Sequence, residues 1–285
     1  MNKVLIFDKI LGYVDYIHYI NSMIEKNKFT EKVKKRTNLK YNHNNDYFDS
    51  INTANKAYIL GFIIADGCIN KTIRGNCVTN RLTFNNSIDD LDIITKIKDE
   101  ISPDSKVYIR ENKSLTVNRK TQTSLKITSF ELCEKLISKY DIIPNKTKHH
   151  NFQFNFNLIP KEFYRDFIRG FFDGDGSVSF YKTKNTIFFN FSFVFNSKLF
   201  AEQIGNIFEE LFNIKAVYYK HVGKTCDYYT LRFNYNRQRT IIIKEIYNYL
   251  YDNCDIYLER KQIKFSKYFE YRANSTDNTV EQCNA

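Results

Sequence analysis

The chain has no tryptophan, only three prolines and only nine glycines among its 285 residues. This scarcity excludes collagen-like and proline-rich linker proteins, and it makes each glycine cluster informative. No stretch approaches the roughly 20 apolar residues that span a bilayer. The residues that follow Met1 lack the long apolar core and small-residue cleavage site of a secretory signal. We therefore expect a soluble intracellular protein, in the cytoplasm of a bacterial, phage or viral host or in an organelle.

Paired cysteines are also missing. The six cysteines include no Cys-x-x-Cys pair and no Cys/His spacing typical of zinc sites, so we expect free thiols in a reducing compartment. There is no phosphate-cradling glycine loop and no nucleophilic Ser/His/Asp set. Hydrolytic chemistry would therefore depend on metal-bound water. The adjacent His149 and His150 fall in a predicted linker, where solvent exposure or phosphate contact is commoner than metal ligation.

Basic residues outnumber acidic ones, 43 to 32, which gives a net charge of +11. Hydrophobic residues make up 42% and aromatic residues 16% of the chain, so a packed globular protein is expected. A basic excess of this size favours a polyanionic partner, of which nucleic acid is the commonest.

Residues 1–52 predict a helical and basic N-terminal extension. Apolar residues recur at helical spacing from Ile10 to Ile24, and a lysine-rich run extends from Lys26 to Lys40. Such a run is either a solvated helix face or tether, or a phosphate contact. No recognisable module identifies this extension.

Two blocks of similar predicted structure follow, at residues 53–147 and 161–272, joined by a linker at 148–160. Each begins with an apolar helix that ends in Asp-Gly, at Asp66 and Asp175, and continues as two strands, a helix, two strands and a helix. The two aspartates are 109 positions apart (175 − 66), about one block, which indicates an internal duplication. The predicted fold is α+β, with two αββαββα repeats and a polar, disordered tail at 273–285. The expected strands are 68–73, 79–87, 105–111 and 122–128, then 177–183, 186–196, 216–222 and 228–236; the other helices are 89–101, 130–140, 198–212 and 237–251.

The predicted strands alternate between apolar and polar residues, as in a sheet with one buried and one wet face. In residues 186–196, Phe189, Phe191 and Phe193 share one face, while Asn190 and Ser192 share the other. The wet faces are rich in Arg, Lys, Asn, Ser and Thr and poor in carboxylates. These residue types read base edges and contact phosphates. The candidate DNA-binding residues are Arg81, Thr83, Asn85, Arg110, Lys126, Ser179, Asn190, Ser192, Arg232 and Asn234.

The two Asp-Gly helices carry small residues at a spacing of four. The segments are AYILGFIIADG (57–67) and DFIRGFFDGDG (166–176). Residues four apart share one helix face, and small residues there let two helix backbones approach closely. Packing through these faces would bring Asp66 and Asp175 together, each followed by a glycine that can end its helix in a left-handed conformation. The candidate interface residues are Gly61, Ala65, Gly170 and Gly174.

Two carboxylates at the negative ends of two helix dipoles repel each other unless a cation lies between them. Hard oxygen ligands select Mg²⁺ or a similar divalent ion, and such an ion is the usual means of hydrolysing a phosphodiester. One Asp-Gly after a helix is an ordinary turn. Two copies, each opening a similar block in a basic protein, favour a shared catalytic centre at Asp66 and Asp175.

The two segments resemble the LAGLIDADG motif of homing endonucleases, in the single-chain form with two motifs. Residues 59–67 match the motif at Gly61, Ala65, Asp66 and Gly67, and residues 168–176 match it at Gly170, Asp173, Asp175 and Gly176. Ile64 replaces the acid that the second copy keeps as Asp173, and Gly174 replaces an alanine. The resemblance extends over roughly residues 53–270.

The resemblance implies a saddle of two antiparallel sheets on double-stranded DNA, and motif helices whose last aspartates bind the metals. It also implies cleavage of both strands with short 3′ overhangs. The metal would be Mg²⁺, with Mn²⁺ or Ca²⁺ able to replace it in binding. The family's active-centre lysine corresponds to Lys146 and Lys261, whose implied role is to stabilise phosphate charge or to orient the water network. The family's water-positioning residues correspond loosely to Ser87 and Ser197. A monomer that needs no protein partner and has a long asymmetric target is expected.

Alternatives on the same scaffold remain open. An intron maturase, which is an RNA-binding splicing cofactor, can keep the same residues, although retention of both acids and both lysines favours cleavage. An intein would need a nucleophile at position 1 and a final His-Asn pair, which Met1 and the last three residues do not supply. A catalytically inactive DNA-binding regulator would lack Asp66 or Asp175. A nickase, and either an intron-encoded or a free-standing gene, fit the sequence.

Overall fold

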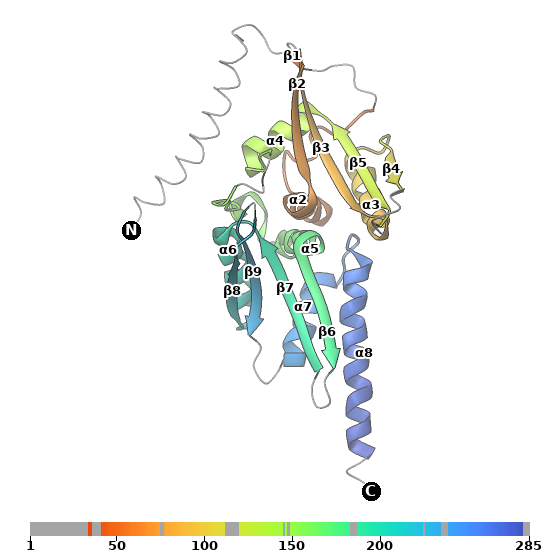
Figure 1. Ribbon diagram of the computed structural model, residues 1–285, viewed down its shortest axis with the longest axis vertical. Helices are drawn as coiled ribbons and strands as arrows, with labels where there is room; N and C mark the ends of the chain where they lie inside the picture. Colours follow the sequence, from red (N-terminus) through yellow and green to blue (C-terminus); the bar gives the residue numbers. More distant parts are fainter. Residues whose placement is uncertain are drawn as a thin grey trace, which may run out of the picture.

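In this computed structural model the described residues are 34–35, 41–74, 77–111, 120–144, 146, 149–182, 187–224, 226–234 and 239–281. They form two αββαββα repeats, each with an antiparallel sheet, which Figure 1 shows above and below a central pair of helices. The predicted α+β fold is therefore confirmed. The predicted helix at residues 10–24 and nearly all of the basic run lie outside the described residues.

The first repeat begins with α2 (Ala54–Asp66), whose first turn is capped by the side chain of Thr53, which accepts from the Lys56 amide. It continues through β2 (Cys68–Arg74), β3 (Cys77–Ser87), the short helix η1 (Ile88–Asp90), α3 (Leu91–Ile101), β4 (Val107–Arg110), β5 (Gln122–Thr128) and α4 (Phe130–Tyr140). The strand order is β2-β3-β5-β4. A two-residue strand of the extension, β1 (Lys34–Lys35), pairs in parallel with β3.

The second repeat repeats this order. It contains α5 (Tyr164–Asp175), β6 (Gly176–Lys182), β7 (Ile187–Phe195), α6 (Lys198–Phe212), β8 (Lys215–His221), β9 (Tyr228–Asn234) and α7 (Arg239–Tyr251). Its strand order is β6-β7-β9-β8. Two 3₁₀ turns, η3 (Phe156–Leu158) and η4 (Lys161–Phe163), precede it in the connection from the first repeat.

The core follows the predicted alternation of the strands. Phe189, Phe191 and Phe193 of β7 are buried, because this face of the sheet is covered by helices. Helix α2 is buried on every side from Ala57 to Ile64, as expected of a helix enclosed between a sheet and a second helix. None of the helices in the described part of the chain combines the length and apolar character that a membrane span requires.

The C-terminal part differs from the prediction. Where a disordered tail was expected from Ala273, helix α8 (Glu259–Glu281) continues to Glu281. Its first half is anchored by the buried rings of Phe265 and Tyr268, which contact Phe189 of β7. Residues 273–281 contain neither proline nor glycine, so nothing in them stops a helix already started by packing.

Candidate active site

Helices α2 and α5 cross at their glycines, in the centre of Figure 1. A Cβ atom on Gly61 would lie 2.0 Å from the main-chain oxygen of Phe167, and one on Gly170 would lie 1.9 Å from that of Tyr58. The two backbones are thus in direct contact, closer than any side chain permits. The structure therefore places both glycines at the crossing, where the sequence analysis expected them.

The same crossing brings the two aspartates together. A Cβ on Gly174 would lie 2.2 Å from the Cβ of Ala65 and 3.4 Å from the carboxyl carbon of Asp66. Asp175 follows Gly174 directly, at the end of α5. Two carboxylates from two repeats thereby share one centre. Within the described residues, no group of three or more His, Cys, Asp and Glu side chains could hold a metal ion, so the protein itself offers two carboxylates here.

The glycines after the two aspartates do not adopt the predicted left-handed conformation. Gly67 has φ −70° and Gly176 has φ −90°, both with extended ψ, because each helix leads straight into a strand. Glycine is required there by space instead. A Cβ on Gly67 would lie 2.8 Å from the oxygen of Ile63, and one on Gly176 would lie 2.1 Å from the ring of Phe172.

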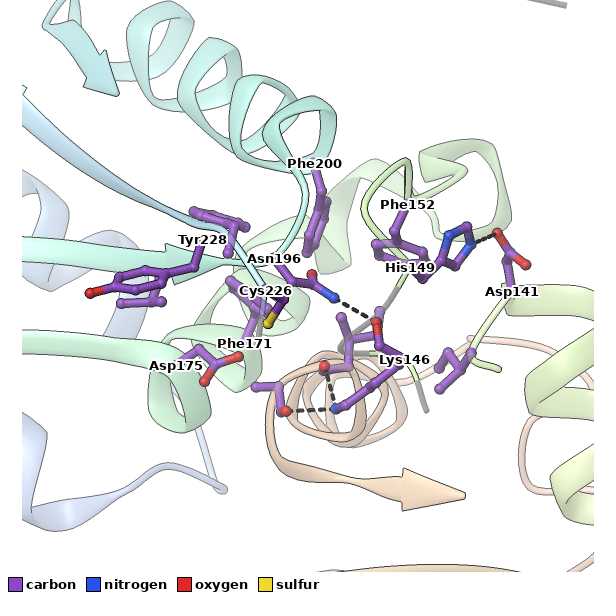
Figure 2. Close-up of a pocket in the computed structure, with 15 residues that line it drawn as sticks. Asp141, Lys146, His149, Phe152, Phe171, Asp175, Asn196, Phe200, Cys226 and Tyr228 are labelled. Carbon is purple, nitrogen blue, oxygen red and sulfur yellow. Dashed lines mark hydrogen bonds and ion pairs between the residues drawn. The ribbon is translucent and has the colours of Figure 1, made fainter. Parts of the chain in front are cut away.

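Lys146 and Lys261 bind carbonyl groups at the ends of the two motif helices, where the helical hydrogen-bond pattern stops. The Lys146 ammonium donates to the main-chain oxygens of Ile63, Ile64 and Ala65 at 2.8, 2.5 and 2.6 Å. Figure 2 shows the Lys146 side chain beside α2. An ammonium has three protons, so Lys146 uses all of them on α2. A cation at a helix C-terminus also opposes the helix dipole.

Lys261 does the same for the second motif helix. Its ammonium donates to the oxygens of Phe172 and Gly176 at 2.5 and 2.6 Å. Both lysines thus hold the motif helix of their own repeat, and Lys261 makes one such bond fewer than Lys146. The sequence analysis proposed that these lysines act on phosphate or water. The structure shows them bound to the peptide chain, close enough to both aspartates to affect their charge.

We predict that Lys261→Met lowers the free energy of unfolding by roughly 1–3 kcal/mol, because it removes the Lys261 donor from the Gly176 carbonyl, whereas the Phe172 carbonyl keeps the Gly176 amide as a donor. Urea denaturation measures this. Lys264→Met, on the exposed side of the same helix, is the matched control and should change stability by less than about 0.5 kcal/mol. Equal losses in the two variants would contradict the capping role.

Burial shifts the pKa of every ionisable group in the centre. The pKa of Asp175 rises to about 6, first because of burial and then because Asp66 repels its charge. Burial also raises the pKa of Asp66, against the hydrogen bond from Asn86 and the charges of the two lysines. Burial lowers the pKa of Lys146 and of Lys261 to about 8. Neutral and charged forms are therefore close in free energy, which is typical of catalytic centres.

The raised pKa of Asp175 predicts that replacing this residue by a neutral one stabilises the protein in a pH-dependent way. A carboxyl group whose folded pKa exceeds its unfolded value stabilises the fold at low pH and loses that contribution as the pH rises through about 6. With metal ions chelated, Asp175→Asn should be more stable than the wild type by roughly 1–3 kcal/mol at pH 8. The difference should vanish near pH 4, as denaturation at each pH will show.

An exposed acid with the opposite shift is the control. The pKa of Asp89 is lowered by hydrogen bonds from Lys120 and Ser87. Asp89→Asn should therefore lose stability at neutral pH and recover it in acid. The same sign in both variants would show that the pKa of Asp175 is not raised in the folded protein.

Two asparagines at the centre were missed by the sequence analysis. Asn86, at the end of β3, donates its side-chain amide to Asp66 at 2.8 Å. Asn196, just after β7, donates to the main-chain oxygen of Lys146 at 2.6 Å. The candidate residues beside them, Ser87 and Ser197, instead cap the helical turns that follow. The end of the second strand in each repeat could have indicated these asparagines, because each lies one residue before the serine that was predicted instead.

A cavity of about 240 Å³ opens between the repeats, lined by Asp175, Lys146 and Asn196 among others. Figure 2 shows Asn196 reaching the Lys146 carbonyl and His149 pointing away from Asp175 toward Asp141. The His149 ring nitrogen lies 2.9 Å from the Asp141 carboxylate. His150 is exposed, and its ring nitrogen lies 3.4 Å from the main-chain oxygen of Asn196.

Further contacts tie the repeats together. The Tyr58 hydroxyl of the first motif helix donates to Asp173 of the second at 2.7 Å, and the Leu258 amide donates to the same oxygen. Arg260, at the start of α8, forms two bonds of 2.6 and 3.1 Å with the buried Asp90 of the first repeat. Asp173 is therefore a structural contact of α5, at the position where the first motif has Ile64.

The candidate DNA-binding residues lie on the sheet faces opposite the helices. In the first sheet Thr83 is paired with Lys126 and Arg81 with Thr128. Asn85 and Arg110 are exposed, whereas Thr83 is buried. In the second sheet the outer-face positions include Ser179, Asn190, Ser192 and Arg232, which neighbour one another across strands. Asn234 pairs with Lys215 through the backbone, and its side chain lies outside the described part.

Fold and centre together define a two-repeat protein with one carboxylate pair at the crossing of its repeats. Residues 162–247 match the family model of the LAGLIDADG-like domain. This match confirms the family resemblance found in the sequence, and it falls on the second repeat. No curated protein matches the chain significantly.

Solved structures similar to the chain include homing endonucleases. I-DmoI in complex with DNA and Mn is 18% identical, with a TM-score of 0.45, over 70% of this chain and 97% of that one. The LAGLIDADG homing endonuclease I-GzeII in complex with its DNA target is 14% identical, with a TM-score of 0.47, over 82% and 97%. The meganuclease I-AabMI bound to uncleaved DNA is 14% identical, with a TM-score of 0.45, over 79% and 95%. Identities this low carry no activity over to this chain.

Proposed function

We infer that the chain is a divalent-metal-dependent endonuclease that cuts both strands of DNA at a long, asymmetric site. The observation that carries this proposal is the convergence of Asp66 and Asp175 at the ends of two crossing helices, one from each repeat. Two buried carboxylates held this close repel each other and destabilise the fold, and a bound cation would offset this repulsion.

The residues present fit a magnesium ion. Mg²⁺ is commonly bound by one or two carboxylates together with substrate phosphates and water, so two protein carboxylates suffice. Asp66 and Asp175 would hold it, with Mn²⁺ or Ca²⁺ able to replace it in binding. When bound, such an ion supplies an activated water and offsets charge on the scissile phosphate.

The chain's own residues prepare this centre. Asn86 fixes one oxygen of Asp66, so this carboxylate has a defined orientation. Lys146 and Lys261 fix the helix ends that carry the acids, and their positive charges favour the ionised carboxylates. Lys261 donates to two carbonyls where Lys146 donates to three, which makes Lys261 the better candidate for contact with phosphate.

The outer sheet faces suit duplex DNA. Arg81, Lys126 and Arg110 of the first sheet and Arg232 of the second are positioned to contact phosphates or bases. The net charge of +11 favours this partner. Because both repeats are in one chain, a monomer can contact two half-sites. Because their outer faces differ in residue type, the target is asymmetric.

The test is cleavage of a randomised plasmid library with Mg²⁺, compared with the same reaction in EDTA and in Ca²⁺. We expect a single recurrent cut site with short 3′ overhangs in Mg²⁺, and binding without cleavage in Ca²⁺. Tight binding of a defined RNA with no DNA cleavage would reject the proposal in favour of the maturase. Cuts confined to one strand would identify a nickase.

A further inference from the structure

The outer face of the second sheet carries exposed apolar and aromatic side chains along its whole length. The register places Phe188 opposite Tyr181, Val194 opposite Thr230, and Tyr228 opposite His221, all on the face away from the helices. The large apolar members are between 37% and 58% exposed; they are Tyr181, Phe188, Val194, Tyr219 and Tyr228. These positions alternate with the buried phenylalanines of the core.

These side chains are held in place by one another. Tyr181 and Phe188 stack with ring centroids 5.0 Å apart, and His221 and Tyr228 stack at 4.7 Å. The guanidinium of Arg232 lies over the Tyr219 ring at 5.5 Å. Paired rings lose little conformational freedom on binding, so the face is preorganised for contact.

The corresponding face of the first sheet is different. Its outward positions in β3 and β5 are Cys77, Thr79, Arg81, Thr83, Asn85, Ser87, Gln122, Ser124, Lys126 and Thr128. Of the large apolar side chains that are exposed in the described residues, Tyr108 is the one on this face. The first sheet therefore offers mainly hydrogen-bonding groups, whereas the second offers exposed apolar side chains among its polar ones.

Apolar side chains read one feature of the major groove, the C5-methyl group of thymine. Duplex DNA is favoured as the occupant because the described outer positions contain Arg232 and Lys215 and no carboxylate. The face is also continuous with the proposed centre, since Val194 and Tyr228 line the same cavity as Asp175. Figure 2 labels Tyr228 and Asp175 among the side chains that line this cavity.

We propose that the second repeat reads its half of the DNA target through thymine methyl groups, whereas the first repeat reads its half through hydrogen bonds. This rests on the proposed endonuclease function. The determining residues are Phe188, Val194, Tyr219 and Tyr228, with Arg232 as the main hydrogen-bonding contact among them. The half-site of the second repeat is accordingly thymine-rich.

The test replaces thymine by deoxyuridine, which removes only the methyl group. The probe is the duplex selected from the randomised library, bound in Ca²⁺, with the substitution made in one half-site at a time. We expect the dissociation constant to rise about fourfold for each contacted methyl in one half, the ratio for burying one methylene-sized group. Substitution in the other half should change it less than twofold.

Two variants assign the halves to the repeats. Val194→Thr keeps the shape but replaces one methyl group by a hydroxyl, and it should lessen the deoxyuridine effect in the sensitive half alone. Ile241→Ala, at an exposed apolar position on α7, should leave that effect unchanged. If the selected duplex is bound and cut but neither half responds to deoxyuridine, this inference is overturned and the endonuclease stands. If no duplex is selected at all, both fail.

Discussion

We expect asparagine in place of Asp66 or Asp175 to reduce the proposed cleavage of DNA by about a thousandfold or more. Each substitution removes one of the two carboxylates that converge at the helix crossing and leaves a neutral group of the same shape. Losing a metal ligand costs several kcal/mol of transition-state stabilisation, and about 4 kcal/mol corresponds to a factor of a thousand. Single-turnover cleavage of the selected duplex, with each strand labelled, measures the loss.

The variants should still bind the duplex in Ca²⁺ to within about tenfold, because the sheet faces are unchanged. Asp92→Asn, on the exposed side of α3, is the control and should cut at the wild-type rate. Full activity in either active-site variant would remove that aspartate from the centre. Loss on one strand only would mean that each acid serves its own strand.

The second large effect concerns stability. Alanine at Gly61 or Gly170 should lower the free energy of unfolding by about 3 kcal/mol or more, near the upper end of overpacking effects. The added Cβ would lie 2.0 or 1.9 Å from a main-chain oxygen of the facing helix. Backbone cannot move aside as a side chain can, so the two helices must separate. Urea denaturation and cleavage rate should fall together.

Gly205→Ala is the matched control, because it is the same change within a helix. There the added Cβ meets the Tyr218 hydroxyl at 2.0 Å, the far end of a side chain. Its loss should be clearly smaller, since a rotation of the tyrosine relieves the contact and alanine favours the helix by up to about 1 kcal/mol. A Gly61→Ala variant as stable as the wild type would contradict direct backbone contact between α2 and α5 at the crossing.

The order of elements could be predicted because it depends on local patterns. Period-two alternation placed β7 through Phe189, Phe191 and Phe193, and each strand of the two repeats lies within a few residues of its predicted range. The short strand β1 was not predicted. The meeting of the two acids was also predictable. A spacing of four between Gly61 and Ala65 defines one helix face, and its duplicate defines the partner.

What could not be predicted depends on contacts distant in sequence. Lys146 donates to main-chain carbonyls about 80 residues earlier in the sequence. A contact between residues so far apart cannot be predicted from a local sequence pattern. The extended conformation of Gly67 follows from a strand that begins at once after the helix. Helix α8 has no counterpart in the first repeat, so the internal duplication does not predict it.

The outer face of the second sheet shows a different limit. Alternation marks Phe188 and Val194 as outward-facing, yet their apolar character fits neither the core nor a polar surface. Because these two residues depart from the expected polar outer face, the alternation pattern alone assigns them no role. Here the exceptions cluster on one face, which is what gives them meaning.

We propose that Asp66 and Asp175 form one metal centre between the repeats. A crystal structure with the selected duplex and Mn²⁺, examined for anomalous scattering, tests it most directly. We expect manganese peaks within ligand distance of both carboxylates and next to the scissile phosphates. Manganese bound elsewhere, or aspartates too far apart to share a site, would contradict it.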